Sequence, residues 1–262
     1  MEHETTPGPG ERVLVVDGLT KRFDGELAVD DLSFQAVRGE ILGLVGPNGA
    51  GKTTTLRSVA GILPIQEGSI SISGHDIGSE EEKAKSLLAW VPDDPQPFDS
   101  LTVLEHMQFT ARLYGVANWQ AQGDALIEKF ELTAKRDALG GELSRGMRQK
   151  LAISCAWLSN PSVVLLDEPL SGLDPRGIRA AREAIRDLAD SGVAVILSSH
   201  LLELIEALAD RLLIMDKGRA VFTGTLGEAR MSIAPDPGSS LEEIFMAATG
   251  EHTPFREPRE AP

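Results

Sequence analysis

Short apolar runs alternate with amphipathic stretches along most of this 262-residue chain. Runs rich in Val, Ile and Leu predict β-strands, and stretches with apolar positions every third or fourth residue, at 52–63 and 176–192, predict helices. Strands that alternate with helices are typical of an α/β fold. The predicted strands are RVLVV (12–16), SFQAV (33–37), ILGLV (41–45), SISIS (69–73), LAWV (88–91), VVLLD (163–167), VAVILSS (193–199), RLLIMD (211–216) and AVFTG (220–224).

The middle of the chain departs from this alternation. Between about residues 100 and 158, apolar positions recur at helical spacing and no convincing strand is present. We therefore predict a helical subdomain, over about residues 93–158, inserted into a sheet domain that spans residues 11–230. The charged run SEEEKAK at 79–85 predicts a solvent-exposed helix face.

The two ends of the chain are polar and rich in Pro or Gly, and we expect residues 1–10 and the tail from about Thr249 to be disordered. A C-terminal helix is expected to precede that tail within residues 231–262. No apolar stretch reaches the roughly 18 residues that a membrane-spanning helix needs, and the first residues lack the hydrophobic core of a signal peptide. The prediction is a cytosolic chain.

Charge and cysteine content exclude several classes of function. The formal net charge of −15 argues against a broad nucleic-acid surface, because phosphate backbones are bound by clustered Lys and Arg. The single cysteine, Cys155, lies in an apolar helical stretch, where a buried small hydrophobe is expected rather than a reactive thiol. Disulfide and zinc frameworks are excluded, and any phosphate that the chain binds must be held locally.

The segment GPNGAGKTT at 46–54 fits the pattern G-x-x-x-x-G-K-[ST] of phosphate-binding loops. It follows the predicted strand at 41–45 and precedes a predicted helix, which is the context that the pattern requires. Glycines let the backbone wrap closely around phosphates, and N–H groups at the helix start point toward them. We expect Lys52 to bridge the outer phosphates and the hydroxyl of Thr53 to bind Mg²⁺. The sequence therefore predicts a nucleoside triphosphate site.

Two other predicted strands end in polar residues. In VVLLDEP, Asp167 suits Mg²⁺ and Glu168 suits activation of a water molecule beside the γ-phosphate. A strand that ends in Asp-Glu is by itself usually followed by a solvated turn. Together with the phosphate-binding loop, it indicates a site for Mg²⁺ and water activation. His200 follows the strand at 193–199, on the edge where α/β sheets bind ligands, and its role is either functional or structural.

The stretch ELSRGMRQK at 142–150 opens a predicted helix with bare, positively polarised backbone donors. Ser144 and the amide groups near Gly146 predict a second anion site, because the N-terminal end of a helix attracts negative charge. No lysine like Lys52 of the phosphate-binding loop lies nearby in the sequence to share that anion.

The motifs GPNGAGKT, LSRGM, VVLLDEP, SGLD and the final histidine of VAVILSSH stand in a recognisable order and spacing. They resemble the Walker A, signature, Walker B, D-loop and switch histidine of the nucleotide-binding subunits of ATP-binding cassette (ABC) transporters, from about Val13 to Thr225. The resemblance implies a P-loop NTPase fold of the α/β class, with a RecA-like core sheet, an N-terminal antiparallel β subdomain and an inserted helical subdomain. It also implies hydrolysis of ATP, with Mg²⁺, coupled to transport.

The resemblance further implies partners and residue roles. In this family two cassettes pack head to tail, and the signature helix of one closes over the nucleotide on the P-loop of the other. The expected partners are a second cassette, taken as an identical copy, and a transmembrane permease at the inner face of the cell membrane, with no nucleic acid. The implied catalytic residues are Lys52, Glu168 and His200, and the implied metal ligands are Thr53, Asp93 and Asp167. The implied nucleotide contacts are Phe23, Gly46, Pro47, Asn48, Gly49, Ala50, Gly51, Lys52, Thr53, Thr54, Ser144 and Gly146.

The base that the site binds is expected to be adenine. Phe23 resembles the aromatic residue that stacks on adenine in this family, with a core phenylalanine as the alternative interpretation. No guanine-reading NKxD sequence occurs in the chain.

Two positions depart from the pattern of the family. The signature is usually LSGGQ, and here Arg145 replaces the first glycine; it either adds positive charge to the site or points into solvent, and we expect solvent. The family has glutamine after the strand-ending VP, where this chain has Asp93. We expect Asp93 to take that role beside Mg²⁺, and Gln96 to substitute only if the loop shifts.

The stretches LSRGMRQK and VPDDP together are similar to bacterial cassettes that power exporters with separately encoded membrane proteins. Since the chain is predicted not to span lipid, the motion must pass to another polypeptide. We expect the contact surface on the helical subdomain and at 92–101, with Phe98 as an exposed anchor.

Two rival functions have less support. A soluble cassette ATPase that acts on DNA or the ribosome would carry tandem cassettes, long coiled coils or basic arms, and the sequence has none. A small-molecule phosphotransferase built on a P-loop would leave LSRGM, SGLD and His200 without a role.

Overall fold

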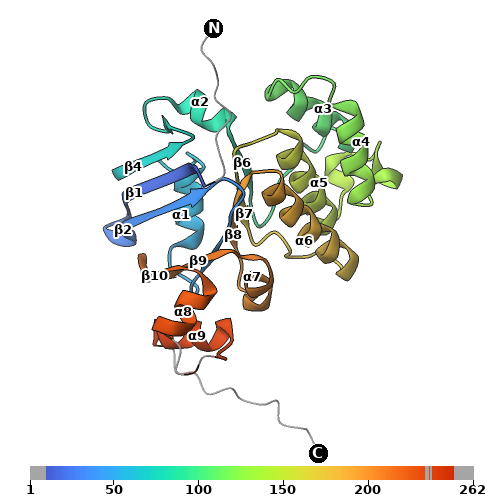
Figure 1. Ribbon diagram of the computed structural model, residues 1–262. Helices are drawn as coiled ribbons and strands as arrows, with labels where there is room; N and C mark the ends of the chain where they lie inside the picture. The colour runs from blue at the N-terminus through green and yellow to red at the C-terminus, as the bar shows by residue number, and fades with distance from the viewer. Residues whose placement is uncertain (1–9, 234–235, 237, 251–262) are drawn as a thin grey trace, which may run out of the picture.

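The computed structural model describes residues 10–233, 236 and 238–250, which are organised around two sheets (Figure 1). The larger sheet contains β10 (Arg219–Gly224), β9 (Arg211–Asp216), β3 (Ile41–Val45), β8 (Ala194–Ser198), β7 (Val163–Asp167) and β6 (Leu88–Val91), in this spatial order. Its strands are parallel except β10, which is antiparallel to β9. The carboxyl ends of the parallel strands therefore share one edge, where α/β sheets bind ligands.

Both faces of the larger sheet are buried, because alternate residues of each parallel strand enter different hydrophobic clusters. In β3, Ile41 and Val45 join the cluster on the side of the helical subdomain, whereas Leu42 and Leu44 join the cluster on the side of the smaller sheet. This double coverage explains why the strands are nearly continuous apolar runs in the sequence.

The smaller sheet is antiparallel, as predicted for the N-terminal β subdomain. It contains β2 (Glu26–Val37), β1 (Arg12–Phe23), β4 (Glu67–Ile72) and β5 (His75–Asp76), in this spatial order. β1 and β2 extend beyond the predicted runs at 12–16 and 33–37, because their pairing continues through polar positions to a hairpin that places Phe23 opposite Glu26.

Helix α1 (Lys52–Val59) lies between the two sheets (Figure 1). Its residues Leu56 and Val59 are fully buried in the cluster that joins the sheets. The helix ends earlier than the predicted 52–63, because Gly61 turns the chain with a φ of +63°. The helix that follows the phosphate-binding loop is thus held from both sides.

The helical subdomain is formed by α3 (Val103–Leu113), α4 (Gln120–Lys129) and α5 (Arg145–Leu158), with short 3₁₀ turns at Thr133–Lys135 and Gly140–Glu142. The helices lie where the spacing of apolar residues predicted them. At the start of α3, the Thr102 hydroxyl accepts a hydrogen bond from the Glu105 N–H and the Glu105 carboxylate accepts one from the Thr102 N–H.

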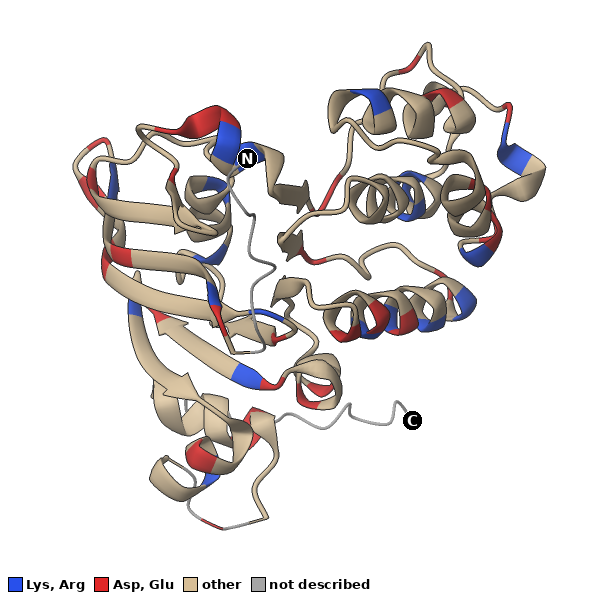
Figure 2. Cartoon of the chain, turned by 45° about the horizontal axis from the view of Figure 1, so that its top comes forward, with Lys and Arg blue, Asp and Glu red and all other residues tan. Residues whose placement is uncertain are grey.

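Two helices follow the strands that carry the predicted catalytic residues. α6 (Pro175–Asp190) begins at Asp174, whose carboxylate accepts a hydrogen bond from the Gly177 N–H. Acidic and basic residues alternate along its outer face (Figure 2). α7 (Leu202–Leu208) was not predicted, although Leu204, Ile205 and Leu208 have helical spacing and are buried.

The remaining helices are α2 (Glu81–Ser86), α8 (Leu226–Ser232) and α9 (Leu241–Thr249). α2 has the predicted solvated face, with an ion pair between Lys85 and Glu81. α9 continues through Thr249, so the tail expected from about Thr249 does not include that residue. Residues 1–9 and 251–262 lie outside the described residues. Within the described part of the chain, no helix combines the length and the apolar character needed to cross a bilayer.

Candidate nucleotide-binding site

A cavity of about 390 Å³ lies at the carboxyl edge of the larger sheet, between the loop after β3 and the end of β7. These two segments come together because they follow parallel strands of one sheet. The cavity therefore joins the predicted phosphate-binding loop to the predicted acidic pair. Its lining residues are Ala28, Asn48, Gly49, Ala50, Gly51, Lys52, Thr53, Thr54, Asp167 and Glu168.

Glycine is needed at three positions of this loop, for different physical reasons. A Cβ on Gly51 would lie 2.4 Å from the carbonyl oxygen of Ala28, and its φ is +97°. A Cβ on Gly46 would lie 2.5 Å from the carbonyl oxygen of Met215. Gly49 has open space around it but a φ of +81°. Two of these glycines thus allow close packing of backbones, and the third allows the turn itself.

The N-terminal end of α1 faces this loop without a side-chain cap. Gly51 is the capping residue, and the first turn contains no acidic side chain. The first N–H groups of a helix have no partner within the helix, and the helix dipole adds positive potential there. This helix end is therefore suited to a phosphate.

The ammonium group of Lys52 folds back over the loop. Its Nζ donates hydrogen bonds to the carbonyl oxygens of Gly46, at 2.6 Å, and Pro47, at 3.1 Å. Burial lowers the pKa of Lys52, and the negative charges of Glu168 and Asp167 oppose that shift. Lys52 is thus a partly desolvated cation beside two carboxylates, where a bound anion is attracted strongly.

The end of β7 is held by the end of β8. Asp167 is almost fully buried, and its Oδ1 accepts a hydrogen bond of 2.6 Å from the Ser198 hydroxyl. The N–H of Glu168 donates to the carbonyl oxygen of Ser198 at 3.1 Å. Glu168 has a φ of +48°, a left-handed conformation that is strained for a glutamate. The fold thus imposes an unusual turn on this predicted catalytic residue.

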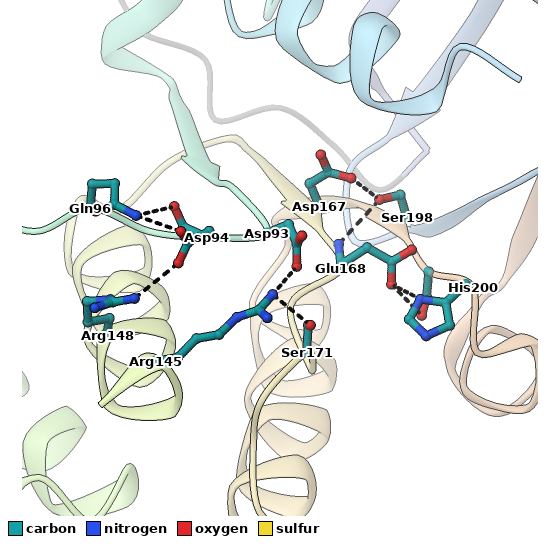
Figure 3. A network of polar contacts seen from close by, with 11 residues as sticks. Asp93, Asp94, Gln96, Arg145, Arg148, Asp167, Glu168, Ser171, Ser198 and His200 are labelled. Atoms are coloured by element: carbon teal, nitrogen blue, oxygen red, sulfur yellow. Dashed lines mark hydrogen bonds and ion pairs between the residues drawn. The ribbon is translucent and has the colours of Figure 1, made fainter. Parts of the chain in front are cut away.

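The carboxylate of Glu168 is directed to the switch histidine (Figure 3). Its Oε2 lies 2.8 Å from Nδ1 of His200 and accepts a hydrogen bond of 3.3 Å from the Ser199 hydroxyl. His200 also lines an adjoining cavity of about 350 Å³ with Gly46, Pro47, Asn48, Ser199, Leu202 and Phe245. All the predicted residues of Walker A, Walker B and the switch position therefore lie around two neighbouring cavities.

The start of α5 has a different arrangement from the bare donors that we expected. The Ser144 hydroxyl accepts a hydrogen bond of 3.3 Å from the Met147 N–H, so one of the helix donors is already paired. A Cβ on Gly146 would lie 2.7 Å from the carbonyl oxygen of Gly172, so this glycine allows the D-loop (residues 171–174) to approach the helix. Neither Ser144 nor Gly146 lines the cavity formed by the P-loop of the same chain.

The expectation that Arg145 points into solvent holds only in part, because its side chain is 46% exposed but is also hydrogen-bonded to two other segments. Its Nη2 lies 2.9 Å from Oδ1 of Asp93 and 2.9 Å from the hydroxyl oxygen of Ser171 (Figure 3). The guanidinium lies against the lid and the D-loop at the surface, because a carboxylate and a hydroxyl on these two segments both accept its hydrogen bonds. Asp93, the predicted metal ligand, is thus paired with a cation and does not line the cavity.

The lid segment, residues 92–101 after β6, makes a second ion pair with the same helix. Nη2 of Arg148 lies 3.2 Å from Oδ1 of Asp94. Nε2 of Gln96 donates to the other carboxylate oxygen of Asp94, at 2.7 Å. The amide of Gln96 is therefore engaged within the lid (Figure 3).

Phe23 lies at the end of β1 and is 44% exposed. The alternative interpretation, a core phenylalanine, is therefore wrong. The ammonium of Lys21 lies 5.5 Å from the centre of its ring, and Phe23 does not line the cavity of the P-loop. Its stacking on adenine stays a prediction.

The sequence comparisons identify the family. A family model described as "ABC transporter" matches residues 29–171, which is 143 of the 262 residues. The chain belongs to the ABC transporter family. As a member of this ABC family, it is an ATP-binding subunit that hydrolyses ATP.

Several characterised members of the ABC family are similar over most of their length. The chain is 37% identical to the Nod factor export ATP-binding protein I of Ralstonia nicotianae, covering 94% of this chain and 77% of that protein. It is 31% identical to the ABC-type transporter ATP-binding protein EcsA of Bacillus subtilis, covering 91% and 97%. The solved structure of an ABC transporter ATP-binding subunit superposes with a TM-score of 0.87 at 32% identity, covering 90% of this chain and 99% of that one.

Several residues of this ABC site were missed by the sequence analysis. Ser198 holds both Asp167 and the turn at Glu168, and its place at a strand end before His200 was an available signal. Ala28 and Phe245 line the two cavities from distant parts of the chain, and nothing in their local sequence indicates it.

Proposed function

We propose that this chain works as one of two identical ABC cassettes that pair head to tail on ATP and drive a separate membrane permease, in the direction of export. One observation carries the pairing. Ser144 and Gly146, at a helix end suited to an anion, do not line the nucleotide cavity of their own chain. In the proposed pair, the nucleotide on the P-loop of a second copy supplies that anion.

The residues around the cavity have distinct roles in this proposal. Lys52 neutralises charge on the outer phosphates, Glu168 orients a water molecule for attack on the γ-phosphate, and His200 holds the Glu168 carboxylate from the γ-phosphate side. Catalysis of this kind consists of positioning and charge stabilisation. The hydrogen bond from Ser199 and the contact with His200 restrict the Glu168 side chain before substrate arrives.

Mg²⁺ fits the donor set of this site. Thr53 and Asp167 present oxygen atoms to one cavity, and a nucleotide-bound Mg²⁺ needs only one or two protein ligands beside phosphates and water. When bound, Mg²⁺ supplies positive charge to the β- and γ-phosphates. We assign Asp93 as a further residue near the ion, which requires Asp93 to leave Arg145. No group of three or more His, Cys, Asp or Glu side chains that could hold a metal converges among the described residues, this site included, so phosphate and water oxygens would complete the ligand set.

The permease contact is assigned to the helical subdomain, on the cytoplasmic face of the membrane. Phe98 on the lid is 57% exposed, stacks on the buried His106 and meets the exposed Phe109 edge to face, so two aromatic rings face outward together. Exposed clustered aromatic residues are typical anchors for a protein partner. The direction of export rests on the similarity to a protein named for Nod factor export.

The test of pairing uses the Glu168→Gln variant, which keeps the cavity but cannot polarise water. With ATP, light scattering should give a mass about twice the 28.1 kDa of one chain. The double variant Glu168→Gln, Lys52→Ala should stay at the mass of one chain, because its P-loop cannot hold the triphosphate. A Glu168→Gln protein that binds ATP and remains monomeric would exclude the proposed pairing.

The permease contact is tested by co-purification with a membrane protein of several apolar spans. Phe98→Arg should reduce the amount of cassette recovered with that protein. Met231→Arg is the matched control, because Met231 is a highly exposed apolar residue on α8, outside the helical subdomain. Equal losses from the two variants would exclude Phe98 as the anchor.

A further inference from the structure

Three segments that lie far apart in the sequence meet at one side chain. The guanidinium of Arg145, at the start of α5, contacts Asp93 on the lid and Ser171 on the D-loop, each at 2.9 Å (Figure 3). The aliphatic part of Arg145 also covers Gly172, where a Cβ would lie 3.2 Å from its Cδ. Arg145 therefore fills the space between the lid, the helix and the D-loop.

The network continues from the D-loop to the catalytic turn. The N–H of Ser171 donates to the carbonyl oxygen of Glu168 at 3.0 Å. Glu168 has the left-handed φ of +48° that aims its carboxylate toward His200. A strained turn keeps its conformation only when its surroundings hold it. The Ser171 contacts are part of those surroundings.

A second ion pair in the same region serves as an internal comparison. Arg148 lies one turn further along α5 and contacts Asp94 at 3.2 Å, joining the same lid to the same helix. Arg148 has no hydrogen bond to the D-loop among the described residues. The two pairs thus differ in whether they reach Ser171.

We propose that Arg145 is a positioning residue for hydrolysis, which couples the lid carboxylate of Asp93 through Ser171 to the turn at Glu168. The inference rests on the proposed role of Glu168. Both partners of the Arg145–Asp93 pair are about half exposed, so the pair is weak enough to break and reform during a catalytic cycle. The lid, which includes the proposed permease contact at Phe98, is thereby connected through Arg145 and Ser171 to the turn that carries the Glu168 carboxylate.

Hydrogen exchange of the nucleotide-free protein tests the coupling. The N–H groups of Ser171 and Leu173 are hydrogen-bonded within the D-loop turn, so their exchange reports its opening. Asp93→Asn should accelerate this exchange by about fivefold, the equivalent of an ion pair worth about 1 kcal/mol. Asp94→Asn should leave it unchanged. No acceleration in Asp93→Asn, or the same acceleration in both variants, would overturn the proposal.

Kinetics separate positioning from nucleotide binding. Arg145→Gln should lower kcat for ATP by about fivefold and leave the affinity of the single chain for a fluorescent ATP analogue unchanged, because Arg145 does not line the cavity. Arg145→Lys should recover most of kcat, since an ammonium can still pair with Asp93. Arg148→Gln is the matched control and should keep kcat.

The outcomes distinguish this inference from the proposed pairing. A loss of affinity in Arg145→Gln with unchanged kcat would overturn the positioning role. If Glu168→Gln fails to pair on ATP but Asp93→Asn still accelerates exchange at Ser171, then the pairing proposal fails and the coupling stands.

Discussion

The P-loop and the start of α5 are both glycine-containing helix starts suited to phosphate, but their neighbours hold them differently. Gly51 lies under the carbonyl oxygen of Ala28, and α1 is buried between two sheets. The start of α5 is held by the Ser144 cap and by half-exposed ion pairs from Arg145 and Arg148. Backbone packing holds the P-loop, whereas hydrogen bonds and ion pairs of surface side chains hold the start of α5. The first is therefore suited to hold a nucleotide, and the second to move onto one.

The largest effect should come from Lys52→Ala, which removes the only side-chain cation that lines the cavity within the described residues. We expect ATP hydrolysis to fall by about 10²- to 10³-fold, as when one preorganised charge-stabilising group is lost. Steady-state phosphate release measures it, and the unfolding midpoint should not fall, because the buried ammonium is partly desolvated. A Lys52→Ala protein that still hydrolysed ATP at the normal rate would show that the P-loop site does not depend on this cation.

The next effect concerns the backbone packing of the P-loop. Gly51→Ala places a methyl group 2.4 Å from the Ala28 carbonyl oxygen at a φ of +97°, so β2 or α1 must shift. We expect weaker ATP binding by calorimetry and a lower unfolding midpoint. Gly49→Ala is the matched control, since it also has a positive φ but open space, and should cost only the conformational strain of about 1 to 2 kcal/mol. Equal losses would show that packing against β2 has no part in holding the loop.

The same contrast explains what could be predicted from the sequence. The strands at 41–45 and 163–167 were predicted at their observed bounds, because residues buried on both faces leave uninterrupted apolar runs. The loop after the first strand and the acidic pair after the second followed from local patterns. Parallel strand order then brought them to one cavity.

The features that sequence analysis missed depend on contacts between distant residues. Arg145 and Asp93 are 52 positions apart, and no local pattern indicates that their side chains meet. The Ser144 hydroxyl was available as a cap in the sequence, but the bare-donor interpretation overlooked it. α7 was not predicted because its 7 residues give only two turns of apolar spacing, which is a weak pattern directly after a strand.

A smaller effect is expected at the start of α5. Ser144→Ala removes the hydroxyl that accepts from the Met147 N–H and should lower the free energy of unfolding by about 1 kcal/mol. Because Ser144 does not line the cavity of its own chain, the affinity of a single chain for ATP should be unchanged, while hydrolysis by paired chains falls. Ser144→Thr keeps a capping hydroxyl and should restore the stability. A drop in single-chain affinity for Ser144→Ala would mean that the two sites are not separate.

The smallest expected response lies on α5 itself, beyond the start for which we propose motion. Cys155 is only partly buried, in contrast to the buried residue expected from the sequence, because it lies at the edge of the core beside Met107, with 3.8 Å between the sulfur atoms. Its thiol is nevertheless desolvated, which raises its pKa from 9.0 to about 11. A raised pKa keeps the thiol protonated, so the thiolate forms only as the pH rises toward 11. Near pH 8, this raised pKa makes the thiolate fraction about a hundredfold lower than that of a thiol with the ordinary pKa of 9.0. Alkylation by iodoacetamide, followed by mass spectrometry, should be correspondingly slow in the folded protein and insensitive to ATP. If ATP accelerated the labelling, the motion that we assign to the start of α5 would extend along the helix to Cys155. The proposed rearrangement would then not be confined to the exposed side chains at the start of the helix.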